Sequence, residues 1–422
     1  MVTDIRDTSN QTLYYPLTGM TGDGNSLQYL NGYTYYHMMQ EDGNKIIRIY
    51  NKAYIKDNPA LKSYVLSSVG RSYRPDSFGY QLDFEELDYG DLATVLLAGD
   101  ADYDFLILSS EDQMGRIMRD LGAYEPLDSI EGVRNVLGRS YNYIEEAATT
   151  EEGDIWMLPL DIDCPILIYN PSLCEQYGID IADIDTYEKL INAVVPLPED
   201  DSVLYNIPYY MMTIDITNKY LMEYGVQGNK SYFDTSIFRK YAEIMSIYDE
   251  NEIDGEGVFG KRIGIGTYFQ DNLPEYLDEY YSNVLLVMKK SRDLIEEYYG
   301  FDFFKASATP GLEEGKEIKS KMSCYFIVLN PNSNKLEYVK EYLSLVCNSM
   351  LEENDSFMFK DFETPENQLE MEIREIYSNG QIFFEYPYEI FSDEMMAYRY
   401  DGKPLDEAIK EMERKMDMYL NE

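Results

Sequence analysis

Polar and apolar residues follow two patterns along the chain: short continuous apolar runs, and longer segments with an apolar residue every three or four positions. Residues 105–110, FLILSS, begin with four consecutive apolar side chains, which is typical of a strand buried on both faces. The helical spacing recurs in five segments: 113–122, 185–194, 234–250, 334–350 and 405–420. Strands that alternate with helices predict an α/β protein with largely parallel sheets.

Three other segments have weaker signals. Residues 28–50 contain two aromatic and β-branched runs around a D-G-N turn, a pattern that favours a β-hairpin. Residues 91–100 resemble a short amphipathic helix closed by Gly99, and residues 155–170 are rich in strand-forming side chains.

The motif GEGVFG at 255–260 matches G-x-G-x-x-G but follows a helical segment. We interpret it as an acidic loop, because a dinucleotide fingerprint must follow an apolar strand.

Acidic residues before the first apolar run imitate a calcium loop. They fall at positions 1, 3, 5 and 12 of a twelve-residue window: Asp100, Asp102, Asp104 and Glu111. Position 6 of such a loop requires glycine for its sharp turn, but the residue here is Phe105. Because Phe105 also begins the apolar run, we predict a strand here and no bound calcium.

Composition narrows the classes of partner. The 422 residues carry 35 basic and 78 acidic side chains, a net charge of -43, which argues against nucleic acid and anionic membranes as partners. The hydrophobic fraction of 45% is too high for a disordered polyanion. The sequence has no run of eighteen apolar residues, so it predicts no transmembrane segment. The 42 tyrosines offer flat apolar faces with a hydrogen-bonding tip, which suits both cores and binding surfaces.

Few side chains are suited to catalysis or metal binding. His37 is the only histidine, and it lies in an aromatic run. The four cysteines show no C-x-x-C spacing: Cys164, Cys174, Cys324 and Cys347. We therefore expect buried free thiols, no metal and no cofactor.

The end of the apolar run at 105–108 is a candidate ligand site. Ser109, Ser110 and Asp112 follow it and precede a helix. In α/β sheets, ligands bind beyond the carboxyl ends of strands, where helix N-termini converge. The same side chains could instead cap the following helix, and the sequence leaves both interpretations open.

The order of these motifs resembles the extracellular solute-binding proteins of ABC importers, in particular the carbohydrate-type group with the type II periplasmic-binding fold. The resemblance is carried by residues 94–110, 121–129, 144–179, 308–346 and 403–422. Within them lie an Ala98-Gly99-Asp100 turn, the hinge-entry motif Gly153–Pro159 and the pair Tyr169-Asn170. The family's usual Trp-x-Glu is replaced by Thr186-Tyr187-Glu188.

The resemblance implies an α/β fold of two lobes with hinge crossovers and a mainly helical C-terminal tail. We expect residues 81–160 and 305–350 in lobe 1, joined by an N-terminal segment, 1–80. We expect residues 161–304 and 351–422 in lobe 2. The chain would cross between the lobes near 159–169 and again near 300–312.

The resemblance also implies a non-enzymatic function. The lobes would close over a small solute, most simply a sugar or oligosaccharide, and deliver it to an ABC permease. The protein would be a monomer outside a Gram-positive bacterium, anchored by a lipid. Two alternatives remain: a surface receptor or adhesin that uses the same fold, and a glycoside hydrolase with two carboxylates.

Candidate ligand-binding residues beyond the first strand follow from the same resemblance. The lone Trp156 lies in the hinge-entry motif, so aromatic stacking would depend on tyrosine or phenylalanine. The candidates are Asp161, Asp163, Tyr209, Tyr210, Tyr268 and Phe269. Asp161 and Asp163 would face the same side of a strand. The alternative is a surface turn, with the strand starting at Pro165. Each aromatic pair could equally belong to a core.

Overall fold

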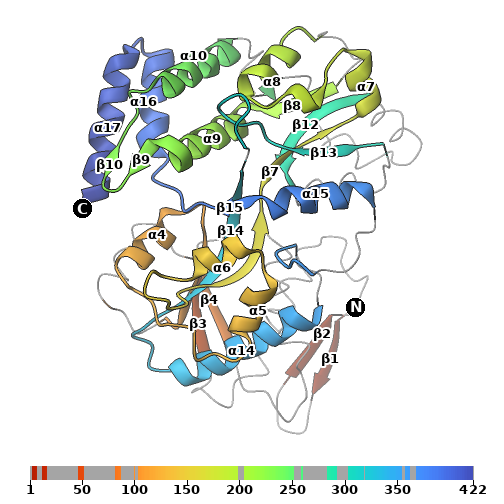
Figure 1. Ribbon diagram of the computed structural model, residues 1–422. Helices are drawn as coiled ribbons and strands as arrows, with labels where there is room; N and C mark the ends of the chain where they lie inside the picture. The colour runs from red at the N-terminus through yellow and green to blue at the C-terminus, as the bar shows by residue number, and fades with distance from the viewer. Residues whose placement is uncertain are drawn as a thin grey trace. The chain divides into compact units, whose positions relative to one another are not determined.

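The computed structural model (Figure 1) describes residues 2–6, 12–16, 46–51, 81–86, 99, 103–197, 204–250, 258–259, 283–291, 303–317, 319–353, 357–361 and 367–421. The chain divides into two compact units. Unit 1 comprises Met1–Asp161 and Cys324–Phe362, and unit 2 comprises Ile162–Ser323 and Glu363–Glu422.

The chain passes from one unit to the other at the junctions 161/162, 323/324 and 362/363. The first junction falls within the range 159–169 expected from the sequence. The return lies later than the expected 300–312, because β13 (Lys305–Ala308) pairs with β7 (Pro165–Tyr169) and so extends the sheet of unit 2. Residues 305–323 therefore lie in unit 2.

The sheet of unit 1 contains the strands β3 (Ile46–Asn51), β4 (Gln81–Glu86), β5 (Phe105–Ser109) and the C-terminal half of β14 (Ser320–Leu329). Strand β3 pairs in parallel with β4 and with β5, whereas β14 is antiparallel to β5. Strand β6 (Leu158–Asp163) also pairs with β14. A separate antiparallel pair joins β1 (Val2–Arg6) and β2 (Thr12–Pro16).

The predicted strand at FLIL is confirmed as β5, and all five of its residues are buried. Phe105 is its first residue, so the backbone extends into the sheet at the position where a calcium loop would turn. The ring of Phe105 stacks on Tyr342, with centroids 6.1 Å apart. This contact packs α14 (Leu336–Glu353) against the sheet and removes two large apolar surfaces from water.

The helices of unit 1 are α4 (Gln113–Asp120), α5 (Val133–Arg139), α6 (Asn142–Ala148) and α14. The helices predicted at 113–122 and 334–350 are thus confirmed. Gly132, the N-cap of α5, has a φ of +92°, and a Cβ there would lie 2.7 Å from Cys347 Cβ on α14. Only glycine allows α5 to begin so close to α14.

The sheet of unit 2 has the order β11–β8–β12–β7–β13. The strands not yet introduced are β8 (Leu204–Pro208), β11 (Val258–Phe259) and β12 (Val284–Lys290). Of its four pairings, only β8 with β12 is parallel. The expectation of largely parallel sheets is therefore wrong for unit 2. A continuous apolar run reports burial on both faces, and it carries no information about strand direction.

Two short pairings complete the described strands. β9 (Val226–Gln227) and β10 (Lys230–Ser231) form an antiparallel hairpin. β15 (Gly380–Ile382) pairs in parallel with residues 320–322 of β14. Strand β11 lies within the motif at 255–260, so the part of that motif that the structure describes is a strand and not a loop.

The helices of unit 2 are α7 (Pro171–Gln176), α8 (Tyr187–Val194), α9 (Tyr209–Tyr220), α10 (Ser236–Glu250), α15 (Gln368–Ser378), α16 (Glu389–Tyr400) and α17 (Leu405–Asn421). A 3₁₀ turn at Ile181–Asp183 and a π-helical turn at Leu221–Gly225 accompany them. The predicted helices at 185–194, 234–250 and 405–420 are confirmed, as is the helical C-terminal tail.

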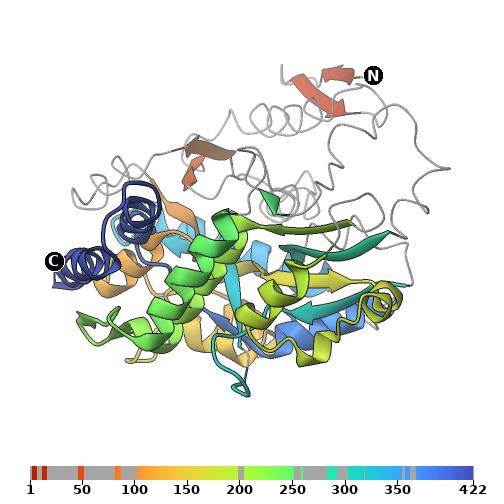
Figure 2. The same cartoon turned by 90° about the horizontal axis from the view of Figure 1, so that it is seen from above.

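Helices α16 and α17 lie side by side in both views (Figures 1 and 2). Ala408, Ile409, Met412 and Met416 form the buried stripe of α17. Their spacing places them on one face of the helix.

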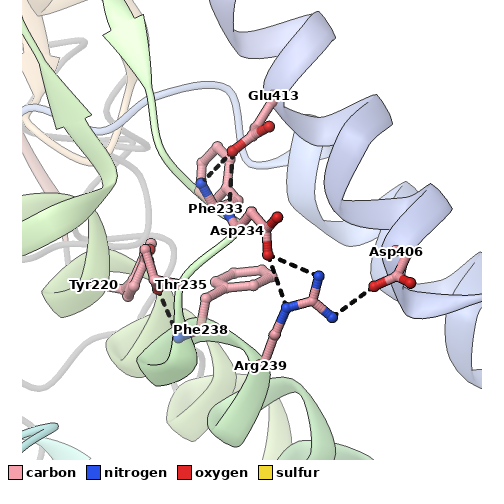
Figure 3. A network of polar contacts seen from close by, with 8 residues as sticks. All are labelled: Tyr220, Phe233, Asp234, Thr235, Phe238, Arg239, Asp406 and Glu413. Atoms are coloured by element: carbon pink, nitrogen blue, oxygen red, sulfur yellow. Dashed lines mark hydrogen bonds and ion pairs between the residues drawn. The ribbon is translucent and has the colours of Figure 1, made fainter.

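Polar contacts fix α17 to the segment that precedes α10 (Figure 3). Glu413 Oε1 accepts hydrogen bonds from the backbone N–H groups of Phe233, at 2.8 Å, and Asp234, at 3.1 Å. Arg239 lies between Asp234 and Asp406, and its guanidinium nitrogens are 2.7 Å from a carboxylate oxygen of each. The charged face of α17 therefore binds backbone donors of the segment that leads into α10.

Several sequence-based predictions lie outside the described residues. They include the first run of the expected hairpin, the environment of His37 and the helix at 91–100 apart from Gly99. The second run of the hairpin is β3, whose described partners are the parallel strands β4 and β5. The four cysteines are free and buried, as predicted.

Candidate functional site

Helix α9 begins at the carboxyl end of strand β8. Pro208 is both the last residue of β8 and the N-cap of α9. Pro208 has no N–H to donate to a strand neighbour, and its fixed φ suits the start of a helix. Tyr209 and Tyr210, the first residues of α9, therefore lie directly after the carboxyl end of β8. In α/β proteins, ligands bind beyond the carboxyl ends of strands.

A groove of about 280 Å³ lies within unit 2, between one face of α9 and one face of α16. Helix α9 supplies residues 210, 213 and 217, and α16 supplies 391, 392, 395, 396, 399 and 400. Both sets have steps of three, four or one, which place them on one face of each helix. The lining residues are Tyr210, Thr213, Thr217, Met245, Tyr388, Phe391, Ser392, Met395, Met396, Arg399 and Tyr400.

Large apolar side chains of this groove are unusually exposed. Tyr210 and Tyr400 each expose 61% of their surface, and Met396 exposes 55%. Single exposed apolar residues are ordinary, but a group of them around one groove is typical of a binding surface. The tyrosines provide flat faces for stacking, and the thioether of Met396 adapts to irregular shapes.

The polar groups of the groove are hydroxyls and one guanidinium. Thr213 Oγ1 donates to the backbone carbonyl of Tyr210 at 3.0 Å, which holds that hydroxyl within α9. Among the described residues, no hydrogen bond engages Thr217 Oγ1 or Ser392 Oγ. Arg399 Nη2 donates to the hydroxyl of Tyr400 at 3.3 Å. An apolar wall with a few convergent polar groups is the usual composition of a small-molecule site.

A buried polar network fixes the opposite face of α9. Lys219 Nζ lies 3.0 Å from Asp215 Oδ2, and it donates to the carbonyls of Thr309, at 2.9 Å, and Pro310, at 2.8 Å. The hydroxyl of Tyr187 donates to the same Asp215 carboxylate. Burial, followed by the charge of Asp215, raises the pKa of Tyr187 well above its usual value, so the phenol stays protonated. The network anchors α9 to α8 and to the chain after β13.

The candidates in the turn between β5 and α4 have structural contacts in unit 1. Ser110 is fully buried, and its backbone and hydroxyl both bond to the backbone of Cys324, at 2.8 and 2.9 Å. Ser109 Oγ accepts from the N–H of Glu111. Asp112 is the N-cap of α4, and its Oδ1 accepts from Met114 N at 2.8 Å. The capping interpretation therefore applies to Asp112.

Asp161 and Asp163 lie in strand β6 and are 1% and 6% exposed. The alternative of a surface turn is therefore wrong, and Pro165 starts the next strand, β7. Asp163 Oδ1 accepts from Cys164 N at 2.8 Å and from Ser291 Oγ at 2.5 Å. Burial and the neighbouring Asp163 raise the pKa of the Cys164 thiol well above its usual value, so this cysteine stays protonated.

The structure places one sequence-based candidate, Tyr210, in the groove. The backbone of Tyr209 starts α9, and Tyr268 and Phe269 lie outside the described residues. Sequence reasoning missed the wall from α16 altogether. A signal was present, because the apolar side chains of residues 388–400 cover a wider face of the helix than a single buried stripe needs. Phe391 is buried while Met396 and Tyr400 are exposed, and a surface helix needs only one apolar stripe.

The described residues contain neither a membrane-spanning helix nor a cluster of metal ligands. No helix in the described part of the chain is long and apolar enough to cross a membrane. Over the same residues, no cluster of three or more histidine, cysteine, aspartate or glutamate side chains could hold a metal ion.

Comparison with known proteins identifies the family resemblance. Residues 78–234 match the family model described as "Bacterial extracellular solute-binding protein". The resemblance predicted from the sequence is thereby confirmed. No curated protein matches the sequence at a significant level.

Solved structures show the same fold over most of the chain. The T. maritima protein MalE3, solved with maltose bound, is similar with a TM-score of 0.62 and 16% identity over 89% of this chain and 99% of its own. The GacH receptor of Streptomyces glaucescens, solved with acarbose, has a TM-score of 0.62 and 11% identity, over 89% of this chain and 98% of its own. Lmo0181 from Listeria monocytogenes, solved with cycloalternan, has a TM-score of 0.59 and 12% identity, over 89% of this chain and 99% of its own. These likenesses confirm the predicted α/β fold of two-lobed periplasmic-binding proteins.

Proposed function

Because the chain carries the fold and part of the sequence signature of bacterial extracellular solute-binding proteins, we propose that it captures a sugar or oligosaccharide and delivers it to an ABC permease. Tyr210, Met396 and Tyr400 carry this proposal, since they are exposed apolar side chains around one groove of unit 2. The C–H faces of a pyranose ring stack on tyrosine rings, and the ring hydroxyls pair with side-chain hydroxyls. Thr217 and Ser392 supply such hydroxyls in the groove.

The comparisons support a sugar more than a peptide or an ion. Maltose, acarbose and cycloalternan are bound by similar structures. In this groove the aromatic side chains provide stacking surfaces of the kind that such ligands use. We also propose ligand contacts outside this groove, at the remaining candidates Ser109, Ser110, Asp112, Asp161 and Asp163. Tyr209, Tyr268 and Phe269 complete the proposed set.

The proposal includes a location and a partner. The family description of the match at 78–234 is extracellular, so we propose that the protein works outside the cell as a monomer. A lipid would anchor it to the surface of a Gram-positive bacterium. The ABC permease would then receive the solute from the liganded protein. A surface receptor without transport would retain binding and lack this last step.

We also propose that the protein does not hydrolyse what it binds. The matching family and the similar structures are binding proteins. In the groove that the structure describes, no carboxylate lines the wall, whereas glycoside hydrolysis needs two flanking carboxyl groups. Incubation with a bound oligosaccharide, followed by chromatography, should therefore return the ligand intact. Release of shorter sugars would favour the hydrolase instead.

A thermal-shift screen tests the proposal. The panel comprises mono- and oligosaccharides, polyols and short peptides, and a ligand that binds only the folded state raises the melting temperature. At one hundred times its Kd, a ligand stabilises the fold by about 2.7 kcal/mol. We expect at least one sugar to raise the melting temperature in a saturable manner. Stabilisation by peptides alone would contradict the sugar assignment.

A further inference from the structure

Methionine side chains line the groove of unit 2 at three positions, 245, 395 and 396, and they differ in their exposure to solvent. Met245 is buried, and Met395 is half-buried against the hydrophobic core of the unit. Met396, in contrast, exposes 55% of its surface. Because an oxidant must reach the sulfur of a thioether to react with it, Met396 is the methionine of the groove that an oxidant in solution attacks first.

Met396 lies in the middle of the wall that α16 contributes to the groove. Ser392, Met396 and Tyr400 all line the groove, and their spacing of four residues places them in one row along the helix. Tyr210 lines the same groove from the start of α9. A solute that fills the groove and stacks on Tyr210 therefore also packs against the thioether of Met396.

We propose that Met396 is a site of reversible oxidation and that the sulfoxide form of the protein captures sugar more weakly. The inference rests on the proposed function and adds a regulation of the same groove. Oxidation replaces an apolar, flexible side chain by a polar, chiral one. The sulfoxide oxygen binds water, and this water must be removed before the C–H face of a pyranose ring can pack there.

The oxidant is a peroxide, of which hydrogen peroxide is the simplest. A lone pair of the Met396 sulfur attacks one peroxide oxygen, an S–O bond forms and the O–O bond breaks. The sulfur gives up two electrons, and the hydroxide that leaves takes the proton of the transferred hydroxyl and becomes water. A methionine sulfoxide reductase reverses the step with two electrons from a dithiol, which becomes a disulfide while the oxygen leaves as water.

Two other exposed methionines of unit 2 provide internal controls, since neither lines the groove. Met371 on α15 exposes 52% of its surface, and Met418 on α17 exposes 51%. Arg414 Nη1 donates to the sulfur of Met418 at 2.8 Å, which engages one of the sulfur lone pairs. Met371 is therefore the closer match to Met396, with similar exposure and no contact with a solute in the groove.

Mild oxidation of the full chain, followed by calorimetric titration, tests the inference. The protein is treated with hydrogen peroxide, and peptide mass spectrometry measures the sulfoxide fraction at each methionine. Maltose, maltotetraose and mannobiose are then titrated into treated and untreated protein. We expect Met396 and Met371 to be oxidised before the buried Met245, and the affinity for at least one of these sugars to fall about tenfold. Methionine sulfoxide reductases for both sulfoxide epimers, with dithiothreitol, should restore the affinity.

Three variants assign the effect to one side chain. Met396→Leu keeps an apolar side chain of similar volume without sulfur, so its affinity should not change on treatment with peroxide. Met371→Leu should keep the full loss of affinity after the same treatment. Met396→Gln places a polar group at the same position and should bind sugar weakly before any treatment. The melting temperature of each treated and untreated protein without sugar reports its folding.

The outcomes separate this inference from the proposed function. Sugar binding that is equally tight or tighter after oxidation of Met396 overturns the inference and leaves sugar capture intact. So does a Met396 that stays reduced while Met371 is oxidised. A loss of affinity that persists in Met396→Leu overturns the assignment to Met396. Binding of none of the sugars overturns both. If Met396→Leu does not fold, recovery of affinity by the reductases on the unmodified chain still tests the oxidation.

Discussion

Lys219 Nζ lies 3.0 Å from Asp215 Oδ2, one helical turn away on α9, and both side chains are almost completely buried. Lys219 also binds the carbonyls of Thr309 and Pro310. The ion pair therefore faces away from the groove and ties its α9 wall to the rest of unit 2. The position of Tyr210 on that helix depends on this anchor.

Removal of the lysine should destabilise the protein strongly. Lys219→Met leaves Asp215 charged and buried without its cation, which costs about 3–5 kcal/mol. Urea denaturation measures the loss in the free energy of unfolding. The double variant Asp215→Asn/Lys219→Met should recover part of it, because no unpaired charge remains.

An exposed ion pair provides the control for that experiment. Lys189 Nζ lies 2.8 Å from Glu314 Oε1 on the surface of unit 2. Lys189→Met should lower the free energy of unfolding far less, because exposed ion pairs contribute little to stability. Equal losses for Lys219→Met and Lys189→Met would contradict the structural role assigned to the buried pair.

The contacts in Figure 3 predict unequal effects for two charged residues. Glu413→Ala removes the acceptor of two backbone N–H groups, at Phe233 and Asp234, and should lower the free energy of unfolding by about 1–3 kcal/mol. Arg239→Ala removes ion pairs near the surface and should lower the free energy of unfolding less than Glu413→Ala does. Chemical denaturation of both variants measures the difference, and a larger loss for Arg239→Ala would contradict it.

The interactions of Glu394 predict a pH dependence of stability. Burial opposes ionisation of this carboxyl, but hydrogen bonds from Lys403 and Lys415 outweigh it and lower its pKa. A carboxyl with a lowered pKa in the folded state stabilises the fold above its unfolded pKa of about 4.3. That stabilisation is lost as the pH falls through the folded pKa.

Replacement of Glu394 should therefore matter at neutral pH and not in acid. Glu394→Gln should lower the melting temperature at pH 7, because the charged hydrogen bonds, each contributing about 1.5–3 kcal/mol, are weakened. Calorimetric scans between pH 7 and pH 3 should show the gap between variant and unmodified protein closing as the pH falls. Glu411→Gln, at a solvent-exposed pair with Arg414, is the control. A constant gap would contradict the prediction.

Asp161 and Asp163 test whether strand β6 contributes to binding. If their carboxylates accept hydroxyls of the solute, Asp161→Asn and Asp163→Asn should each weaken binding by about 1–3 kcal/mol. Titration calorimetry with the sugar found in the thermal-shift screen measures this. Because Asp163 also binds Ser291, the stability of its variant must be measured separately. Unchanged affinity in both variants would remove the pair from the site.

The sequence predicts the elements of this fold better than their connections. Apolar runs and helical spacing suffice for β5, α4, α8, α10, α14 and α17, because the burial pattern of each element follows from its own local sequence. The prediction of strand direction is wrong for unit 2. Apolar side chains such as Ile166 and Val287 occur in parallel and in antiparallel strands alike, so they do not indicate direction. The return crossing was placed too early because residues 305–308 extend the sheet of unit 2 by pairing, which no local pattern reveals.

The same limit applies to the groove. Tyr210 is a candidate only through the family resemblance, because the sequence analysis does not predict the strand β8 that precedes it. Arg399 and Tyr400 come from a helix nearly two hundred positions later, and only tertiary structure brings α16 beside α9. The capping role of Asp112, in contrast, follows from its position before a helix.

The most direct test of sugar capture by the groove is one calorimetric comparison. The sugar that stabilises the protein most is titrated into the unmodified chain and into Tyr210→Ala/Tyr400→Ala, with Tyr338→Ala as the control, since Tyr338 is exposed on α14 of unit 1. We predict one saturable site per chain, lost or weakened at least tenfold in the double variant and unchanged in the control. Equal affinity in all three proteins would contradict it.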